Sequence, residues 1–424
     1  MTHVEQMPDD GVMRAADGTP LKKRLARALR REKMRSFVLI APLLFFILLS
    51  FLAPIADMLF RSVENDIVQN TIPETVTELQ NWDSASGSAP PEEVYAAFYR
   101  DFLVAREKRI HTRLGSRLNY ELSGMSGMFR RTGRDIRRFD EAGPFKPQFI
   151  KSDEDWGAVE TWRVIKKFSS LYTAGYYLSA IDAESTSESF ELKPADERIY
   201  IKLFIRTMWM SLLITFSTLL LGYPIAYLMS HTKRSTANLL MILVLLPFWT
   251  SLLVRTSAWK VLLQQQGVIN DFLVWINVVD DSARLVMINN QLGTIIAMTH
   301  ILLPFMILPL YSVMQTISPS YVRAAKSMGA NDWTAFWRVY FPNTIPGIGA
   351  GAILVFILAI GYYITPELVG GTQGVFISNR IAFHISSSLN WGLAAALGAI
   401  LLLLVLLLFY CYDKIVGIDN VKLG

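Results

Sequence analysis

Two ionisable side chains, Arg255 and His300, lie inside runs of sequence that are otherwise apolar enough to enter a lipid bilayer. A charged or polar group is costly in hydrocarbon, so residues of this kind usually face a partner or a solute pathway. Aromatic and acidic side chains that could contact a solute are expected near the outer side of the same runs: Trp249, Trp259, Tyr362, Tyr363 and Glu367. These seven residues are the candidate lining of a pathway for a polar solute.

Each of these residues also has a purely structural interpretation. Arg255 could extend toward the membrane interface or bond backbone carbonyls, the two tryptophans could anchor at the interface, and the two tyrosines could pack helices together. The candidates also disagree about the solute. Glu367 and the aromatic rings suit a cation, whereas Arg255 suits an anionic or zwitterionic solute. The residues by themselves leave this alternative open.

Motifs of catalysis and of nucleotide binding are missing from the sequence. It contains no G-x-x-x-x-G-K-[ST] loop, no H-E-x-x-H, no G-x-S-x-G and no Cys/His cluster at metal-ligand spacing. Cys411 is the single cysteine, so no intrachain disulfide can form. We therefore expect no enzyme activity, and no metal or cofactor bound by this chain.

A capped, charged segment separates two apolar runs: "SPSYVRAAKSMGANDWTAFWRVYFPNTIPGI", from Ser318 to Ile348. Ser318 followed by Pro319 is a strong helix start, because the hydroxyl can cap a backbone N–H and proline gives up a donor that would have no partner. Gly329 can adopt the left-handed conformation that ends a helix. The helix expected between them contains Val322, Arg323, Ala324, Ala325, Lys326 and Met328.

A second helix is expected directly after this turn. Asn331 can cap it, and Pro342 is expected to end it or bend it. Its aromatic residues are Trp333, Phe336, Trp337 and Tyr340. The pair would present a short helix with small side chains, held by an aromatic second helix, and this shape suits docking into a groove on a partner.

The remaining sequence places this segment in a membrane protein. Of 424 residues, 52% are hydrophobic and only 18% are charged, which is more apolar than an ordinary soluble domain. A helical span needs roughly 20 apolar residues. Six runs of this kind occur: Phe37–Phe60, Ile201–Ser230, Asn238–Leu263, Leu292–Met314, Ile345–Val369 and Trp391–Tyr412.

Lysine and arginine residues beside the spans predict their orientation. The basic stretch "LKKRLARALRREKMR" precedes the first span, so the N-terminus is expected in the cytoplasm, and six spans return the C-terminus to the same side. The run that follows is too long for a signal-peptide core, so it is expected to be an uncleaved anchor. The basic stretch is expected either as an amphipathic helix along the inner leaflet or as a disordered tail.

About 140 polar residues separate the first two spans and would lie outside the cytoplasm. Helical periodicity predicts a mostly helical insert after a linker-like stretch at Asn81–Glu93. One apolar face carries Tyr95, Phe98, Tyr99 and Phe102, and another carries Trp162, Ile165, Phe168, Leu171 and Tyr172. We expect these aromatic residues to form the core of the insert rather than to stack on a ligand.

The segment from Ser318 resembles the cytoplasmic loop of the permease subunits of binding-protein-dependent ATP-binding-cassette (ABC) importers. That signature reads E-A-A, three residues, G, nine residues, I-x-L-P. Here Ala324 and Ala325 occupy the alanine positions, Gly329 follows after three residues, and Pro342 ends the pattern. Arg323 stands where the family has glutamate. From about Ile201 onward, stretches such as "LLPFWTSLLVRTSAWKVLLQQQGVIN" and "YYITPELVGG" resemble the spermidine/putrescine-type permeases.

The resemblance implies a fold and a set of partners. The fold would be an all-α polytopic membrane protein with six transmembrane helices of the type I ABC importer permease kind and a mostly helical extracytoplasmic insert between the first two. Partners would be two ATPase subunits that hold ATP and Mg, a second, related permease subunit and a periplasmic solute-binding protein, in the inner membrane. The solute would be a polyamine such as spermidine or putrescine, or an amino-acid-like or opine-like compound.

These expectations divide the chain into five parts. They are a basic cytoplasmic segment at 1–36, the first span at 37–60, a periplasmic insert at 61–199, a permease core at 200–413 with the docking loop at 318–342, and a cytoplasmic tail at 414–424. A secondary transporter or channel that works without an ATPase is the alternative. It would not need a capped docking helix, and the six spans show no obvious internal repeat.

Overall fold

A computed structural model describes residues 21–84, 86–185 and 190–416. Residues 1–20 of the expected N-terminal segment and 417–424 of the expected tail lie outside the described residues. The chain divides into two compact units, Met1–Phe60 and Arg61–Gly424, which are described separately.

The first unit contains one long run of helix. α1 (Leu21–Ile47) continues through a π-helical turn at Leu48–Leu52 into α2 (Ala53–Arg61). The part from Glu32 to Arg61 is long and apolar enough to span a membrane. The basic stretch is helical from Leu21 and enters the apolar run without a break. The described part is therefore helical, as one sequence-based alternative predicts, and the disordered tail is wrong for these residues; the position of the helix along the inner leaflet stays a prediction.

Four further helices of the second unit are long and apolar enough to span a membrane: Tyr200–His231, Gln291–Thr316, Asp332–Gly361 and Trp391–Lys414. The second, fourth and sixth expected spans agree with them to within two residues. With Glu32–Arg61 they make five spans among the described residues, or six if one bent pair of helices counts as a span.

The bent pair is the third expected span, which is not one straight helix. Helix runs from Arg234 to Trp249 and again from Leu252 to Leu262, with an angle of 95° between the two parts. A 3₁₀ turn that contains Pro247 ends the first part, and the hydroxyl of Ser251 accepts a hydrogen bond from the N–H of Val254 (3.2 Å) to cap the second. Proline and a cap together break the span.

The fifth span begins and ends earlier than its sequence indicates. Helix is continuous from Asp332 to Gly361, so Pro342 does not end it. A π-helical turn at Phe336–Tyr340 directly precedes α18 (Phe341–Gly361), and the N–H of Phe341 bonds the carbonyl of Phe336. The wider turn shifts the hydrogen-bond register just where proline has no N–H to give. The end of the expected span forms a separate helix, α19 (Ile364–Val369).

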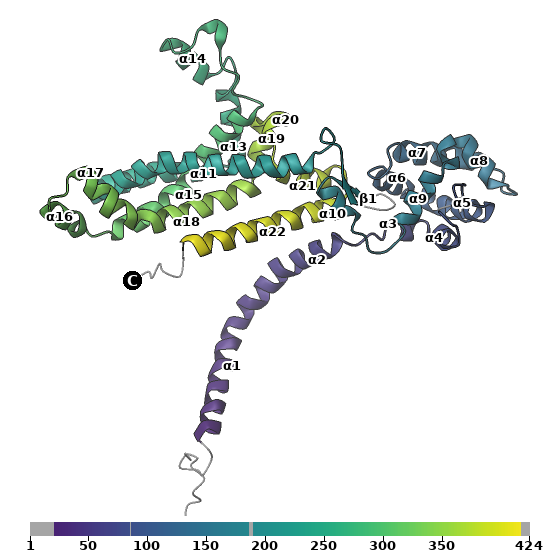
Figure 1. Ribbon diagram of the computed structural model, residues 1–424, viewed down its shortest axis with the longest axis horizontal. Helices are drawn as coiled ribbons and strands as arrows, with labels where there is room; N and C mark the ends of the chain where they lie inside the picture. The colour runs from purple at the N-terminus through teal and green to yellow at the C-terminus, as the bar shows by residue number, and fades with distance from the viewer. Residues whose placement is uncertain (1–20, 85, 186–189, 417–424) are drawn as a thin grey trace, which may run out of the picture. The chain divides into compact units, whose positions relative to one another are not determined.

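The long helices α11 (Tyr200–His231), α15 (Gln291–Thr316) and α18 pack against one another as a bundle (Figure 1). Close approach requires small residues at the crossings. A Cβ at Gly222 would lie 3.2 Å from both Met306 and Ile307, and one at Gly351 would press on Met306. The remaining helices of this part are α12 (Arg234–Leu245), α13 (Leu252–Leu262), α14 (Val268–Trp275), α16 (Pro319–Ser327), α17 (Asp332–Ala335), α20 (Gly371–Gly374), α21 (Ile377–Ser386) and α22 (Trp391–Val416).

The segment between the first two spans is a small helical body with its own core, as expected. Phe98 is fully buried, and its ring lies 4.7 Å from that of Trp156 and 5.4 Å from that of Trp162, centroid to centroid. The hydroxyl of Tyr95 donates to the carbonyl of Trp156 (2.6 Å), and burial raises the pKa of Tyr95 to about 12. Its helices are α3 (Ile67–Thr71), α4 (Pro73–Gln80), α5 (Glu92–Glu107), α6 (His111–Leu118), α7 (Met125–Asp135), α8 (Phe145–Ser152), α9 (Val159–Lys167) and α10 (Gly175–Ala180).

Three details of this body differ from the sequence-based expectation. Leu171 and Tyr172 are 48% and 62% exposed, because α9 ends at Lys167 and the helical face does not continue to them. The stretch expected to be a linker is anchored, since Trp82 is buried and its indole N–H bonds the carbonyl of Ser88 (3.2 Å). A short antiparallel pair, β1 (Ala183–Ser185) and β2 (Phe190–Leu192), pairs Ala183 with Leu192.

The helical body and the bundle meet around α10, α21 and α22. A Cβ at Gly392 would overlap the ring of Tyr176, so this glycine allows α22 to approach α10 closely. His384 on α21 is buried; its Nε2 lies 2.9 Å from the hydroxyl of Tyr200 and its Nδ1 lies 2.8 Å from that of Ser388. Burial, helped by the charge of Arg380, lowers the pKa of His384 to about 4.

Candidate functional site

The segment from Ser318 forms two capped helices at one end of the bundle (Figure 1). The hydroxyl of Ser318 accepts a hydrogen bond from the N–H of Ser320 (3.4 Å) at the start of α16. Gly329 has φ +93°, the left-handed conformation that ends a helix. Asn331 then accepts from the N–H of Thr334 (2.8 Å) and caps α17. The three local signals in the sequence therefore predicted the positions of this turn and both helix starts correctly.

The turn between the two helices has a brace that sequence reasoning did not identify. Lys326 on α16 forms an ion pair with Asp332 at the start of α17, across Gly329. Ala325 is buried, and Val322 packs against the bundle core. One face of α16 thus packs on the protein, and an exposed ion pair links α16 to α17 across the turn.

The opposite face of this segment is exposed and partly apolar. Met328 is 83% exposed and Trp333 is 72% exposed, and Tyr321 and Trp337 are exposed nearby in sequence. Arg323 is also exposed. Large side chains gathered on a rigid, exposed element are typical of a protein–protein contact. The geometry fits the docking role that the sequence suggests for the segment.

Aromatic side chains connect the segment to the bundle. The ring of Phe336 lies 5.9 Å from that of Tyr227, and the ring of Tyr340 lies 5.3 Å from it, centroid to centroid. Tyr223, one turn earlier on α11, lies 5.9 Å from Phe341 by the same measure. Because these rings pack edge to face or tilted, a displacement of α16 and α17 would be carried to α11 and α18.

Four of the candidate pathway residues lie together beside the break in the third span. The indole N–H of Trp259 donates to Nδ1 of His300 (3.0 Å), and the two ring centroids lie 5.3 Å apart. Arg255 lies close enough to His300 and Tyr362 for its charge to act on both. Its Nε and Nη1 atoms are buried without a hydrogen-bond partner among the described residues.

Among the described residues, no side-chain hydrogen bond, ion pair or ring contact joins the other three candidates to this cluster, although Tyr363 follows Tyr362 in the chain. Glu367 accepts a hydrogen bond from Nδ2 of Asn379 (2.7 Å), which also donates to the carbonyl of Tyr363 (2.8 Å). The ring of Tyr363 is exposed, and Trp249 is 75% exposed. Trp249 ends the first half of the broken span, at the point where the chain turns.

Polar residues that sequence reasoning missed hold this region together. The hydroxyls of Thr256 on α13 and Thr365 on α19 are hydrogen-bonded (3.1 Å) and buried. Ser378 donates to the carbonyl of Tyr362 (2.6 Å), at the break before α19. A six-span topology makes the stretch around Ser378 an outer loop, but it forms α21. The sequence pattern that could have predicted this helix is the pair of apolar residues Ile377 and Ile381, which are four positions apart.

Comparison with known proteins agrees with this architecture. Residues 205–417, which begin in α11 and include the two-helix segment from Ser318, match the family described as binding-protein-dependent transport system inner membrane component. The spermidine/putrescine transport system permease protein PotB of Haemophilus influenzae is 36% identical over 220 residues, 51% of this chain and 76% of that protein. PotB of Escherichia coli is 32% identical over 224 residues, 53% of this chain and 81% of that protein.

A third relative has a broader name. The inner membrane ABC transporter permease protein YdcU of Escherichia coli is 31% identical over 264 residues, 58% of this chain and 83% of that protein. The family match covers half of the chain, and the helical body between the first two spans lies outside it. The chain belongs to the family of binding-protein-dependent transport system inner membrane components, the multi-pass permease subunits of ABC importers.

Proposed function

We propose that this chain forms the translocation pathway of an ATP-driven importer for a small polar solute of the polyamine type, such as spermidine or putrescine. The identity to two spermidine/putrescine permeases supports this solute class. An amino-acid-like or opine-like solute is the second candidate. Nε and Nη1 of Arg255, beside the candidate pathway, are buried and have no hydrogen-bond partner among the described residues. A carboxylate would satisfy them, whereas a polycation would not.

The observation that carries the proposal is the geometry of α16 and α17. α16 is a short helix that is capped at both ends and packed through Ala325; Met328 at its C-terminal end and Trp333 on α17 are exposed and available to a partner. Two ATPase subunits, which would hold ATP and Mg, would receive this segment and its counterpart on a second, related permease. Arg323 replaces the glutamate of the family signature, so docking would rest on helix shape and apolar contact rather than on that charge.

The proposed topology places the docking segment and both termini in the cytoplasm and the helical insert in the periplasm, where a solute-binding protein would deliver the solute. Support comes from α11, whose last residue, His231, packs against Tyr340 of the docking segment, while its first residue, Tyr200, packs against the cluster that includes Tyr176 of the insert. The two functions thus attach to opposite ends of one long helix (Figure 1).

Transport would follow from a change in the relative stability of two states. Closure of the ATPase dimer on ATP would move α16, and the packed aromatic rings would carry that displacement into α11 and α18. A partner can shift such an equilibrium only by contacting the two states differently, and the rigid docking segment is the part that provides this difference. Arg255, Trp259, His300 and Tyr362 would then be open to one side of the membrane at a time.

Affinity purification of the tagged chain from its native membrane tests the proposal. We expect a P-loop ATPase and a second permease in the eluate, with ATP turnover that a periplasmic protein and its solute stimulate. Binding of spermidine or putrescine by that periplasmic protein would identify the solute class. A chain that purifies alone and moves solute in liposomes without ATP would refute the proposal.

A further inference from the structure

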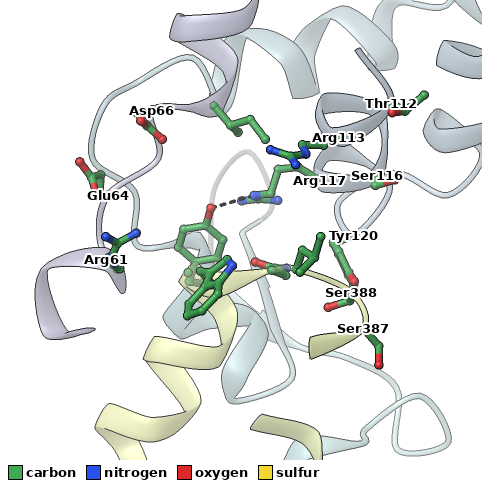
Figure 2. Close-up of a pocket in the computed structure, with 16 residues that line it drawn as sticks. Arg61, Glu64, Asp66, Thr112, Arg113, Ser116, Arg117, Tyr120, Ser387 and Ser388 are labelled. Atoms are coloured by element: carbon green, nitrogen blue, oxygen red, sulfur yellow. Dashed lines mark hydrogen bonds between the residues drawn. The ribbon is translucent and has the colours of Figure 1, made fainter. Parts of the chain in front are cut away.

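A cavity of about 540 Å³ lies where the helical insert meets the connection between α21 and α22 (Figure 2). α6 and α10 of the insert form part of its wall, and residues 387–392 form another part. The polar side chains that the wall contributes include Glu64, Asp66, Arg113, Arg117 and Ser387. The cavity is separate from the candidate solute pathway, because it contains none of the seven residues assigned to that pathway.

Arg117 is the feature of this cavity that its structural role does not explain. Its side chain is only 5% exposed. Nη1 forms an ion pair with Glu121 (2.8 Å), and Nε donates to the hydroxyl of Tyr176 (3.0 Å). Nη2 is buried and has no partner among the described residues. A buried donor of a charged group is costly to leave unpaired, so the site is incomplete as it stands.

The guanidinium of Arg117 is also held in place. Its central carbon lies 5.0 Å from the ring centroid of Phe168 and 4.5 Å from that of Tyr176. Two aromatic contacts and two hydrogen bonds fix the orientation of the guanidinium before any ligand arrives. Pre-organisation of this kind lowers the entropic cost of binding.

A second arginine lies next to the first. Arg113 and Arg117 are one turn apart on α6, and Figure 2 shows both side chains at the same wall. Like charges at this spacing repel. Glu121 compensates Arg117, whereas Arg113 forms no ion pair with any residue that the structure describes. The α6 side of the cavity therefore carries one positive charge that Glu121 does not compensate and can attract an anion, while Arg61 on another part of the wall lies with Glu64 and Asp66 in the same lining.

The rest of the lining restricts the kind of anion. Glu64 and Asp66 lie at another part of the wall, and their charge works against a ligand with two or more negative charges. Hydroxyl groups of Thr112, Ser116 and Ser387 can donate to a carboxylate. A concave volume of this size suits a small molecule rather than a protein surface.

We propose that this cavity binds a small monocarboxylate, whose oxygens accept hydrogen bonds from Nη2 of Arg117 and from Arg113. Arginine matches the planar carboxylate group in geometry as well as in charge. The bound molecule would contact both the insert and residues 387–392, and would therefore tie the insert to the permease core. Neither the ATPase nor the transported solute takes part in this binding. A test of carboxylate binding is therefore independent of a test of the proposed transport function.

The test is calorimetric titration of the full chain in lipid nanodiscs with three probes. They are butyrate, butylamine of the same size but opposite charge, and inorganic phosphate. We expect saturable binding of butyrate below roughly 10 mM, weaker binding of phosphate and none of butylamine. Hydrogen exchange should slow at 112–117 and 387–392 when butyrate is bound. Phosphate that binds more tightly than butyrate, or no saturable binding of butyrate, would overturn the proposal.

Matched variants locate the site. Arg113→Gln changes an accessible residue, so the fold should survive, and it should weaken butyrate binding roughly tenfold, the effect of losing one hydrogen bond to a charged group. Arg117→Lys should weaken it at least as much, because lysine cannot reproduce the fixed planar group. Arg130→Gln removes an exposed arginine of α7 outside the cavity and should leave butyrate affinity unchanged. Wild-type affinity in Arg113→Gln, or the same loss in Arg130→Gln, would contradict the assignment.

Discussion

The turn at Gly329 offers a quantitative test of the docking segment. Its φ of +93° is one that L-residues adopt at a cost of roughly 1–2 kcal/mol, and more when they are β-branched. A Cβ at this position would meet no atom within 4 Å, so backbone strain rather than a steric clash is what a substitution introduces. Gly329→Val should therefore strain the turn by about 2–3 kcal/mol, whereas Gly329→Asn should be tolerated.

The same strain predicts the loss of ATPase binding. If docking needs the present angle between α16 and α17, a penalty of about 2 kcal/mol weakens association roughly thirtyfold. Biolayer interferometry of the permease in nanodiscs against the purified ATPase would measure this. We expect a large loss of affinity in Gly329→Val and near wild-type affinity in Gly329→Asn. The melting temperature of the bundle should change little, because the exposed turn can relax in the free protein and incurs the strain only when docking requires its present angle.

Gly124 provides the matched control for this experiment. It also has positive φ, +99°, and a Cβ added there would meet no atom within 4 Å, but it lies in the insert at the start of α7. Gly124→Val introduces the same kind of strain far along the chain from the docking segment and should leave ATPase affinity unchanged. Wild-type affinity in Gly329→Val, or an equal loss in Gly124→Val, would refute the reasoning.

Four other measurements examine separate parts of the molecule. The pKa of His384 is lower in the folded protein than in the unfolded chain, so the unfolded chain takes up a proton at this residue first as the pH falls. The free energy of unfolding should therefore decrease from pH 6.5 toward pH 4, by on the order of 1–2 kcal/mol at pH 5. Thermal melts of His384→Gln should show a flatter pH dependence than those of the wild type. Phe98→Ala should lower the stability of the insert by about 3–5 kcal/mol in proteolysis-monitored unfolding, and an exposed Leu171→Ala should not. Arg255→Gln should reduce solute-stimulated ATP turnover roughly tenfold without loss of the complex, and unchanged turnover would place Arg255 outside the pathway. Arg323→Glu should leave ATPase affinity within a few-fold of wild type, because α16 keeps its caps, and complete dissociation would show that charge controls docking.

The conformation of the segment from Ser318 was predictable because its signals are local. Ser318, Gly329 and Asn331 each act on the backbone within three residues, so the sequence contains all the information that the two helix starts and the turn need. Membrane-spanning helices are equally predictable from the sequence, because the lipid bilayer requires a minimum length and an apolar composition. The ion pair of Lys326 with Asp332 follows only once the turn is built.

Features set by contacts between distant residues were not predictable in the same way. Two features accompany the break in the third span. Pro247 lies in the turn, but a membrane helix can tolerate a proline, so this residue alone does not predict the break. The other feature is the hydrogen bond between Thr256 and Thr365, which are more than a hundred residues apart in the sequence. Proline at 342 ordinarily ends a helix, but the π-helical turn before it lets the helix continue. Sequence reasoning grouped the pathway residues by type, whereas the fold separates Glu367, held by Asn379, from Arg255.

The helix α11 connects these observations physically. Its 32 residues span about 48 Å at 1.5 Å per residue, more than the hydrocarbon core of a bilayer. At its last turn Tyr227 packs against Phe336 and Tyr340 of the docking segment, and at its first turn Tyr200 bonds His384, beside the proposed carboxylate cavity. A closely packed helix moves as a rigid body rather than by compression. Pro224 inside α11 is the point at which the helix can bend, so part of a displacement that a partner imposes on α16 is expected to reach the junction with the insert, where a ligand that ties the insert to residues 387–392 would oppose it.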